Sequence, residues 1–301
     1  MSMMPSKPGT IAFHWGLIIS AGVVLLLAMP GSVISFDSLP AVALIAAVVV
    51  LGLPHGALDA WLVWRVAVFR SVGQFTIFLC GYLCLAGLVV SLWWWNTSFA
   101  LALFLAYSAW HFADDWRDGK GAAAPAPPLM GLAVIGLPAF FHPDIVAQLF
   151  SIIAGNEGAA VAAMLGWLGG LSMFFLSALA VFQFRHRRHR SIQIVLLVLL
   201  AWLTTPLLYF FIYFCFAHSV RHYSLVWTLA DSGRRRPLLL SAGILTSVSV
   251  IIGAIAVSLM PPDMTIDDRL LSALFVGLAA LTVPHLLVIE VCKRRHQQWA
   301  G

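Results

Sequence analysis

The chain has 301 residues, of which 61% are hydrophobic and only 10% are charged. Soluble domains carry about 25% charged residues, so this composition excludes an ordinary soluble domain. The net charge of +5 does not indicate a nucleic-acid partner, because the basic residues stand in short clusters between apolar runs, as they do beside membrane helices. We therefore expect an all-α, polytopic integral membrane protein.

Ten apolar segments follow one another along the chain and predict a bundle of about ten transmembrane helices, since about 20 apolar residues cross a bilayer core. The first is expected to be a retained helix rather than a cleaved signal peptide, because it is long and contains His14 and Trp15. No intervening segment is long enough for a second domain, so residues 1–301 are expected to form a single membrane-embedded domain. The segments are Ile11–Pro30, Pro40–Trp64, Phe75–Trp95, Ser98–Ala113, Leu129–Phe141, Ala160–Phe184, Ile192–Leu203, Pro206–Leu229, Leu238–Met260 and Leu270–Val291.

The basic residues set the predicted orientation. Fifteen of the 17 Lys and Arg residues fall in six clusters, at residues 7, 65–70, 117–120, 185–190, 234–236 and 293–295. With ten crossings all six clusters lie on one side, which the positive-inside rule identifies as the cytoplasm. A single long helix from Ile192 to Leu229, broken at Thr204-Thr205-Pro206, would place two of the clusters on opposite sides. We therefore predict a multi-pass protein of the cell membrane, in contact with lipid, with both termini in the cytoplasm.

Five histidines lie inside the predicted membrane segments, where ionisable residues are costly and usually functional. Pro54 removes a backbone donor and, with Gly52 and Gly56, predicts a kink in its helix. Kinked helices at membrane depth usually line a cavity or a site. In chain order the histidines are His55 in Gly52-Leu53-Pro54-His55-Gly56-Ala57-Leu58-Asp59, His111 in Trp110-His111-Phe112, His218 and His222 in His218-Ser219-Val220-Arg221-His222, and His285 after Pro284.

The ten-helix topology gathers these histidines at one depth. All four helices that carry them run inward, so depth can be counted back from the first cytoplasmic charge. His55 is 10 residues before Arg65, His111 is 3 before Asp114, His222 is 9 before Asp231 and His285 is 8 before Lys293. At about 1.5 Å per residue these positions agree within roughly 10 Å along the membrane normal. The spacing predicts one cluster in the inner half of the bilayer.

This cluster of histidines predicts a metal centre. A single membrane histidine more often makes a hydrogen bond between helices, but His218 and His222 are spaced i, i+4 and share one helix face. Asp59, one turn after His55, is expected to accept the second ring N–H of that histidine and so support the site without touching the metal. The partner of Arg221 stays open between Asp59, Asp115 and solvent, and the role of His285 is also open.

Imidazole donors suit iron, copper, zinc or nickel. A catalytic zinc usually has three protein ligands and a water, whereas four histidines on an octahedral ferrous ion leave two positions, enough for dioxygen. Two histidines one turn apart do not fit the axial positions of a haem. The di-iron histidine boxes of membrane desaturases need His-His pairs, which the chain lacks. Aromatic residues on the histidine-bearing helices could wall an apolar substrate channel.

The ordered motifs at residues 52–59, 110–112, 218–222 and 284–285 resemble the Brp/Blh family of membrane β-carotene oxygenases, from about Pro40 to Val291. The resemblance implies Fe²⁺ held by His55, His111, His218 and His222, with no catalytic residue beyond the metal ligands. It implies cleavage of β-carotene by dioxygen at the central double bond, giving two all-trans-retinal, and a retinal-binding rhodopsin as a downstream partner. Ala113 departs from the pattern, since a glycine is expected after His-Phe.

Two other classes of protein remain as alternatives: a carotenoid-binding membrane protein without catalysis, and a transporter that uses its histidines for protons. A retinylidene protein is excluded, because the Schiff base needs a lysine inside a helix and Lys7, Lys120 and Lys293 all lie at termini or in loops. Stoichiometric iron in the purified protein would separate an oxygenase from a proton relay.

Overall fold

The structure of the chain, a computed structural model, describes residues 8–27, 40–65, 71–117, 127–185, 187–230 and 235–295. These ranges are almost entirely helical and contain no strand, which confirms the expected all-α fold. Two π-helical turns, η2 (Val48–Gly52) and η5 (Tyr213–Ser219), and two 3₁₀ turns, η3 (Asp114–Trp116) and η4 (Gly155–Glu157), interrupt the α-helices. The α-helices are α1 (Pro8–Leu27), α2 (Ala41–Ala47), α3 (Pro54–Ala57), α4 (Asp59–Arg65), α5 (Val72–Trp95), α6 (Thr97–Ala113), α7 (Pro127–Phe141), α8 (Pro143–Ala154), α9 (Gly158–Gln183), α10 (Arg188–Leu203), α11 (Pro206–Ile212), α12 (Val220–Leu229), α13 (Arg235–Leu259) and α14 (Ile266–Arg295).

Five helical stretches of the described residues are long and apolar enough to cross a membrane. Their surfaces carry many exposed apolar side chains, such as Leu88 on α5 and Ile251 on α13, as expected for helices that face hydrocarbon. Helices also lie within all ten predicted segments, although several are shorter than a full crossing. The five stretches are Val42–Trp64, Val72–Trp95, Pro143–Gln183, Arg235–Leu259 and Ile266–Cys292.

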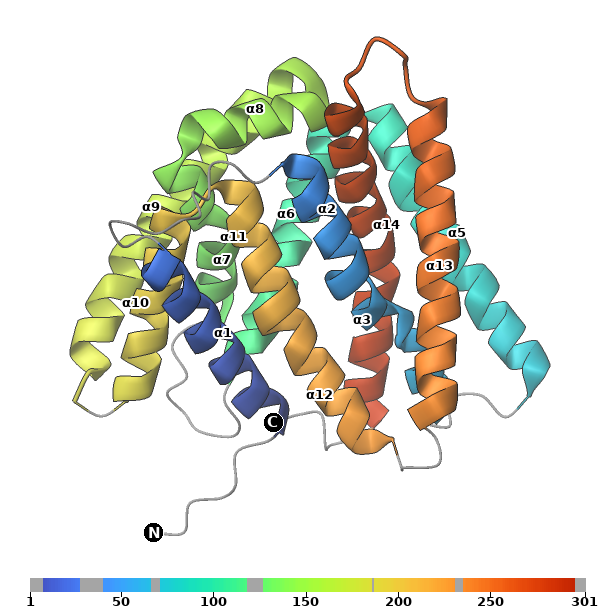
Figure 1. The fold of residues 1–301 in the computed structure, drawn as a ribbon, viewed down its shortest axis with the longest axis horizontal. Helices are drawn as coiled ribbons and strands as arrows, with labels where there is room; N and C mark the ends of the chain where they lie inside the picture. Colours follow the sequence, from blue (N-terminus) through green and yellow to red (C-terminus); the bar gives the residue numbers. More distant parts are fainter. Residues whose placement is uncertain are drawn as a thin grey trace.

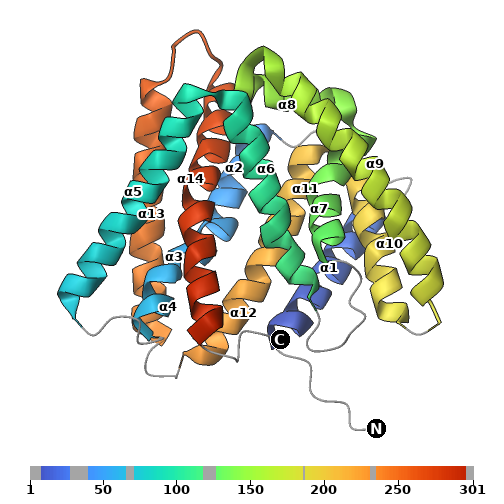
Figure 2. The ribbon, with the colours of Figure 1, turned by 180° about the vertical axis from the view of Figure 1, so that it is seen from behind.

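The chain reverses direction at Thr204-Thr205-Pro206. Helix α10 ends at Leu203, and α11 begins at Pro206, where the missing N–H of proline costs no helical hydrogen bond. Thr205 is extended, the conformation favoured before proline. In Figure 1, α10 rises from the lower edge and α11 with α12 returns to it, and Figure 2 shows the same from behind. The alternative of one long helix over this region is therefore wrong.

Helix α8 was not expected from the sequence. It begins at Pro143, ends before Gly155, whose φ of 70° suits glycine, and lies at the upper edge of the bundle (Figure 1). Its inner face carries Val146 and Phe150, both buried, while Ile145 points outward. At 12 residues it is too short to cross a bilayer. It instead closes the bundle from above.

Glycines allow several helices of the bundle to approach closely. A Cβ atom at Gly136 of α7 would overlap Gly169 of α9, and one at Gly16 of α1 would overlap the Phe216 carbonyl of η5. Small residues at such crossings are typical of membrane helix packing. The second contact sets η5, which carries His218, firmly against α1.

Candidate metal centre

The five histidines of the predicted membrane segments lie together in the centre of the bundle. His55, on α3, has its ring centroid 5.3 Å from that of His218, 5.8 Å from His222 and 5.2 Å from His285. The His111 ring lies 4.6 Å from His218 and 5.3 Å from His285. His222 and His285 are 5.4 Å apart. Five histidines from four separate chain segments therefore form one cluster, as the depth count predicted.

A break in the helix positions His55. Gly56 N–H donates to the Leu53 carbonyl rather than to Gly52, and Pro54 has no N–H to donate. The Gly52 carbonyl, left without its usual helical donor, accepts from His55 Nδ1 at 2.5 Å. This confirms the kink predicted from the Gly-Leu-Pro-His-Gly sequence. Because Nδ1 is used in this way, the other ring nitrogen is the one that can act as a donor to a metal.

A π-helical turn positions His218. Such turns are rare and are frequent at functional sites, and η5 ends with His218-Ser219 before α12 carries His222. Both rings of this i, i+4 pair contact the ring of His55, as their shared helix face predicted. Nε2 of His218 and Nε2 of His222 are buried and have no hydrogen-bond partner within the described residues.

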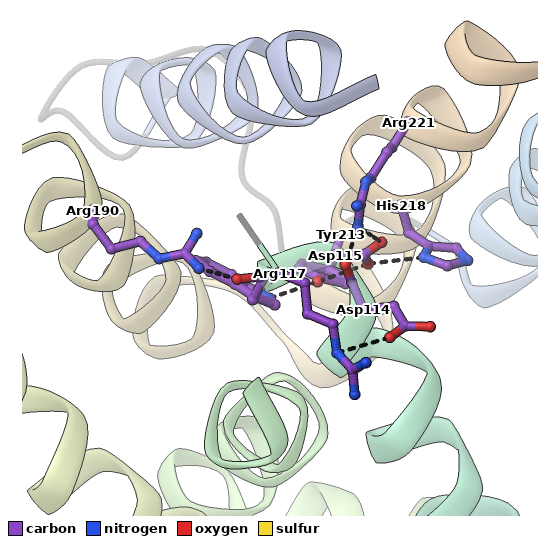
Figure 3. Close-up of polar contacts among 8 residues, drawn as sticks. Asp114, Asp115, Arg117, Arg190, Tyr213, His218 and Arg221 are labelled. Carbon is purple, nitrogen blue, oxygen red and sulfur yellow. Dashed lines mark hydrogen bonds and ion pairs between the residues drawn. The ribbon is translucent and has the colours of Figure 1, made fainter. Parts of the chain in front are cut away.

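A buried carboxylate holds the His218 ring (Figure 3). Asp115, on the short η3 turn after α6, accepts from His218 Nδ1 at 2.8 Å and from the Tyr213 hydroxyl at 3.1 Å. Arg221 forms an ion pair with the same carboxylate at 3.2 Å. Of the partners left open for Arg221, the structure therefore selects Asp115. Asp115 was not assigned to the site from the sequence, although its position four residues after His111 was a usable signal.

The polar contacts of Asp115 continue to the basic edge of the bundle. Tyr213 accepts from the Trp116 indole N–H at 3.0 Å. The buried Arg190 guanidinium, from the start of α10, donates to the Trp116 carbonyl and lies 5.2 Å from the indole ring. Figure 3 shows this line of contacts from His218 to Arg190. Arg190 thus ties the η3 turn, and with it Asp115, to a second helix.

A second carboxylate, Asp59, holds His285 and not His55. Asp59 is buried and its two oxygens lie 2.8 and 2.9 Å from His285 Nδ1. The expectation that Asp59 orients His55 was wrong, because the broken helix turns the His55 ring back to Gly52 and away from the residue one turn on. Asp59 also accepts from the Tyr82 hydroxyl at 3.3 Å. His285 therefore joins the cluster with a carboxylate partner of its own.

The donor set suits a metal that prefers imidazole. Nδ1 of His55, His218 and His285 is engaged by a carbonyl or carboxylate, which leaves Nε2 as the remaining donor, the pattern found behind metal-bound histidines. Within the described residues, no group of three or more His, Cys, Asp or Glu side chains already has the geometry of a formed site. The rings would have to turn toward a common point to ligate one ion.

Two apolar chambers meet at the cluster. One is lined by His55 and His111 together with residues of α6, α7, α8, α9, α11, η5 and α14. Among them are Tyr209, Phe210 and Tyr213, aromatic residues of the α11–η5 segment that also carries His218. The other is lined by His55 and His285 together with residues of α3, α5 and α13. They contain about 980 and 950 Å³ of space not filled by atoms, including any part open to the surroundings. The residues that line both are His55, Phe214, Leu278 and Thr282.

Comparison with known proteins identifies the family. A family model described as β-carotene 15,15′-dioxygenase matches residues 46–293, a range that includes all five histidines and both carboxylates. The chain belongs to this family of carotenoid-cleaving enzymes. The β-carotene 15,15′-dioxygenase of uncultured marine bacterium 66A03 is 31% identical over 262 residues, which cover 84% of this chain and 94% of that protein. No solved structure matches the chain. The resemblance drawn from the histidine motifs is thereby confirmed.

Proposed function

We propose that this protein is an iron-dependent membrane dioxygenase that cleaves β-carotene at its central 15,15′ double bond and releases two molecules of all-trans-retinal. One observation carries the proposal. A buried cluster of histidines stands where two apolar chambers meet. An elongated hydrocarbon that occupied both chambers would present an internal bond, and not an end, to the histidines.

We assign His55, His111, His218 and His222 as the ligands of Fe²⁺, with His285 as a fifth imidazole beside them. Imidazole is a common ligand of iron. When bound, ferrous iron supplies the activation of dioxygen. Either four or five of these imidazoles would hold the ion while leaving it able to bind dioxygen.

The protein side chains orient the histidine rings and the polyene, and they exclude water. Asp115 and Asp59 fix the tautomer and direction of the His218 and His285 rings, so that both Nε2 atoms keep a lone pair for the metal. The apolar walls keep water away and hold the polyene with one double bond at the cluster, because positioning selects the bond that reacts. The atoms of the reaction balance as follows. One C=C bond breaks, and each of its two carbons receives one oxygen atom of O₂ and becomes an aldehyde carbon.

The membrane arrangement is part of the proposal. Ten crossings with both termini in the cytoplasm of a cell membrane place the α9–α10 junction and the start of α13 on the same, inner side. The basic residues 185–190 and 235–236 lie at these places, and both views of the bundle put them at one edge. Reporter fusions after Arg190 and after Arg236 should both report a cytoplasmic location; opposite answers would refute the ten-helix topology. A retinal-binding rhodopsin is a natural consumer of the product.

The test of the reaction is expression in cells that accumulate β-carotene, followed by analysis of the products. We expect retinal and loss of the orange colour. The His218→Ala variant should be inactive, whereas His189→Ala, an exposed histidine of the basic edge, should match the wild type. Unequal apocarotenals from the wild type would keep the oxygenase and reject central cleavage. Unchanged carotene with iron bound and dioxygen supplied would reject this substrate.

A further inference from the structure

The two chambers end differently. Every residue that lines the chamber under α8 is buried or partly buried, including Val146 and Phe150 at its α8 end. We call it the closed chamber. The chamber beside α5 and α13, the open chamber, has four exposed apolar side chains in its wall. They are Leu79 and Leu83 on α5 and Val248 and Ile252 on α13.

The exposed side chains of the open chamber belong to two helices that are long and apolar enough to cross a membrane. Leu83 is 56% and Ile252 57% exposed, so this wall faces the surroundings of the bundle. In water such a rim would be costly, whereas in hydrocarbon it needs no covering. A lipid-dissolved molecule can therefore reach the histidines from this side without crossing a polar surface.

The α8 side of the closed chamber is formed by Val146, Leu149 and Phe150, which project from α8 into its lining. Helices α8 and α9 are joined through the Gly155 turn, and a Cβ atom at Gly158 would overlap the Phe150 carbonyl, so this end is tightly packed. A rod pushed in from the histidines would stop at α8.

We propose that the polyene enters end-first through the open chamber, between α5 and α13, and that the closed chamber under α8 measures how far it passes the histidines and so selects the bond that is cleaved. This inference rests on the proposed function. His55 lines both chambers, so a rod that occupied both of them would pass the histidines. The terminal group of one half rests against α8 while the other half fills the open chamber.

Filling the end of the closed chamber tests the measuring role. In Val146→Phe, fewer carbons can pass the histidines, so the reacting bond moves toward the inserted end. We expect unequal aldehydes, one shorter and one longer than retinal, and a fall in central cleavage of about 10–100-fold, the scale of loss from a small misplacement. The matched control is Ile145→Phe, on the outer side of α8, which should still give retinal alone.

The possible outcomes distinguish a failure of the proposed bond selection by the closed chamber from a failure of the proposed reaction. Leu149→Phe, at the same end, replaces Val146→Phe if that variant does not accumulate, and bound iron is measured for each variant. If the filled variants make retinal alone, the closed chamber does not select the bond that is cleaved. Complete loss of cleavage with iron retained would overturn the proposal as well, because a shorter chamber should move the cleaved bond and not abolish the reaction. A wild type that makes no retinal would instead overturn the proposed function.

A neighbouring pair of residues tests the entrance. Ile252 lines the open chamber, and Ile251, equally exposed at 59% against 57%, does not. With β-carotene in lipid vesicles, Ile252→Trp should raise KM several-fold and leave iron content and the bond cleaved unchanged. Ile251→Trp should behave as the wild type. An equal KM for the two variants would show that the substrate does not enter between α5 and α13.

Discussion

Two carboxylate–histidine pairs flank the histidine cluster, and they are built differently. Asp115 serves His218 but also pairs with Arg221 and accepts from Tyr213 (Figure 3). Asp59 serves His285 and accepts from Tyr82, with no Arg or Lys ion pair among the described residues. Asp115 therefore joins a network that would hold its position without a metal, whereas the charge of Asp59 depends on His285. We infer that Asp115 is a fixed anchor and that Asp59 is the weaker partner.

Removing the two histidines gives the largest expected effects. His218→Ala should abolish cleavage and reduce bound iron to background, because it deletes a ligand and leaves Asp115 facing a cavity. His285→Ala should lower bound iron but retain residual activity, because the four assigned ligands remain. Iron content of the purified variants and retinal formation check both. Equal and complete loss of bound iron and of retinal formation in the two variants would contradict the proposed difference between the Asp115–His218 and Asp59–His285 pairs.

Replacing the anchor should have the next largest effect. Asp115→Asn keeps the shape but can no longer fully accept from His218, Tyr213 and Arg221 together. Losing a carboxylate behind a metal-bound histidine typically costs about 10–100-fold in metal affinity or activity, and we expect the upper part of that range here. The measurement is iron affinity from a chelator titration alongside the rate. Asp114→Asn, its partly exposed neighbour, is the matched control and should be close to wild type.

The weaker partner should show a smaller loss. Asp59→Asn should lower iron affinity by about 10-fold, the lower part of the same range, and leave the extracted yield of folded protein unchanged. An effect as large as that of Asp115→Asn would contradict the proposed ranking. Unchanged iron affinity and rate would remove Asp59 from the site altogether.

The two carboxylates can also be compared through the tyrosine hydroxyls that donate to them. Tyr213→Phe deletes a hydroxyl that is buried and joins Asp115 to Trp116, whereas Tyr82→Phe deletes one that makes longer contacts, at 3.3 Å to Asp59 and 3.4 Å to the Leu281 carbonyl. A hydrogen bond to a charged group contributes about 1.5–3 kcal/mol, and a weaker one contributes less. We expect a thermal unfolding temperature that falls more for Tyr213→Phe. The reverse order would indicate that the Asp59 side is the more rigid.

Composition and charge were sufficient to predict an all-helical chain and the break before Pro206, because long apolar runs and clustered arginines report directly on helices and their ends. Helix α8 was missed because its 12 amphipathic residues are too few to stand out as a membrane crossing. The number of crossings stays a prediction, since several helices are too short to qualify by length.

The depth of the candidate site in the membrane could be predicted from the sequence. Counting residues from the cytoplasmic charges placed five histidines at one level, and the structure brings them together. The partners of those histidines were not predictable. Helix spacing favoured Asp59 beside His55, but the break at Pro54 and the π-turn at η5 rotate the rings away from ideal helix positions. The two chambers depend on the packing of seven or more helices and have no local signal.

Metal analysis of the purified wild-type protein is the most direct test of whether the histidine cluster binds one ferrous ion. We expect about one iron per chain, retained through purification in the absence of chelators. We also expect iron to fall to background in His218→Ala and to stay at the wild-type level in His189→Ala. A wild-type protein that cleaves β-carotene while containing no iron, or containing stoichiometric zinc instead, would contradict the assignment of a ferrous ion to the cluster.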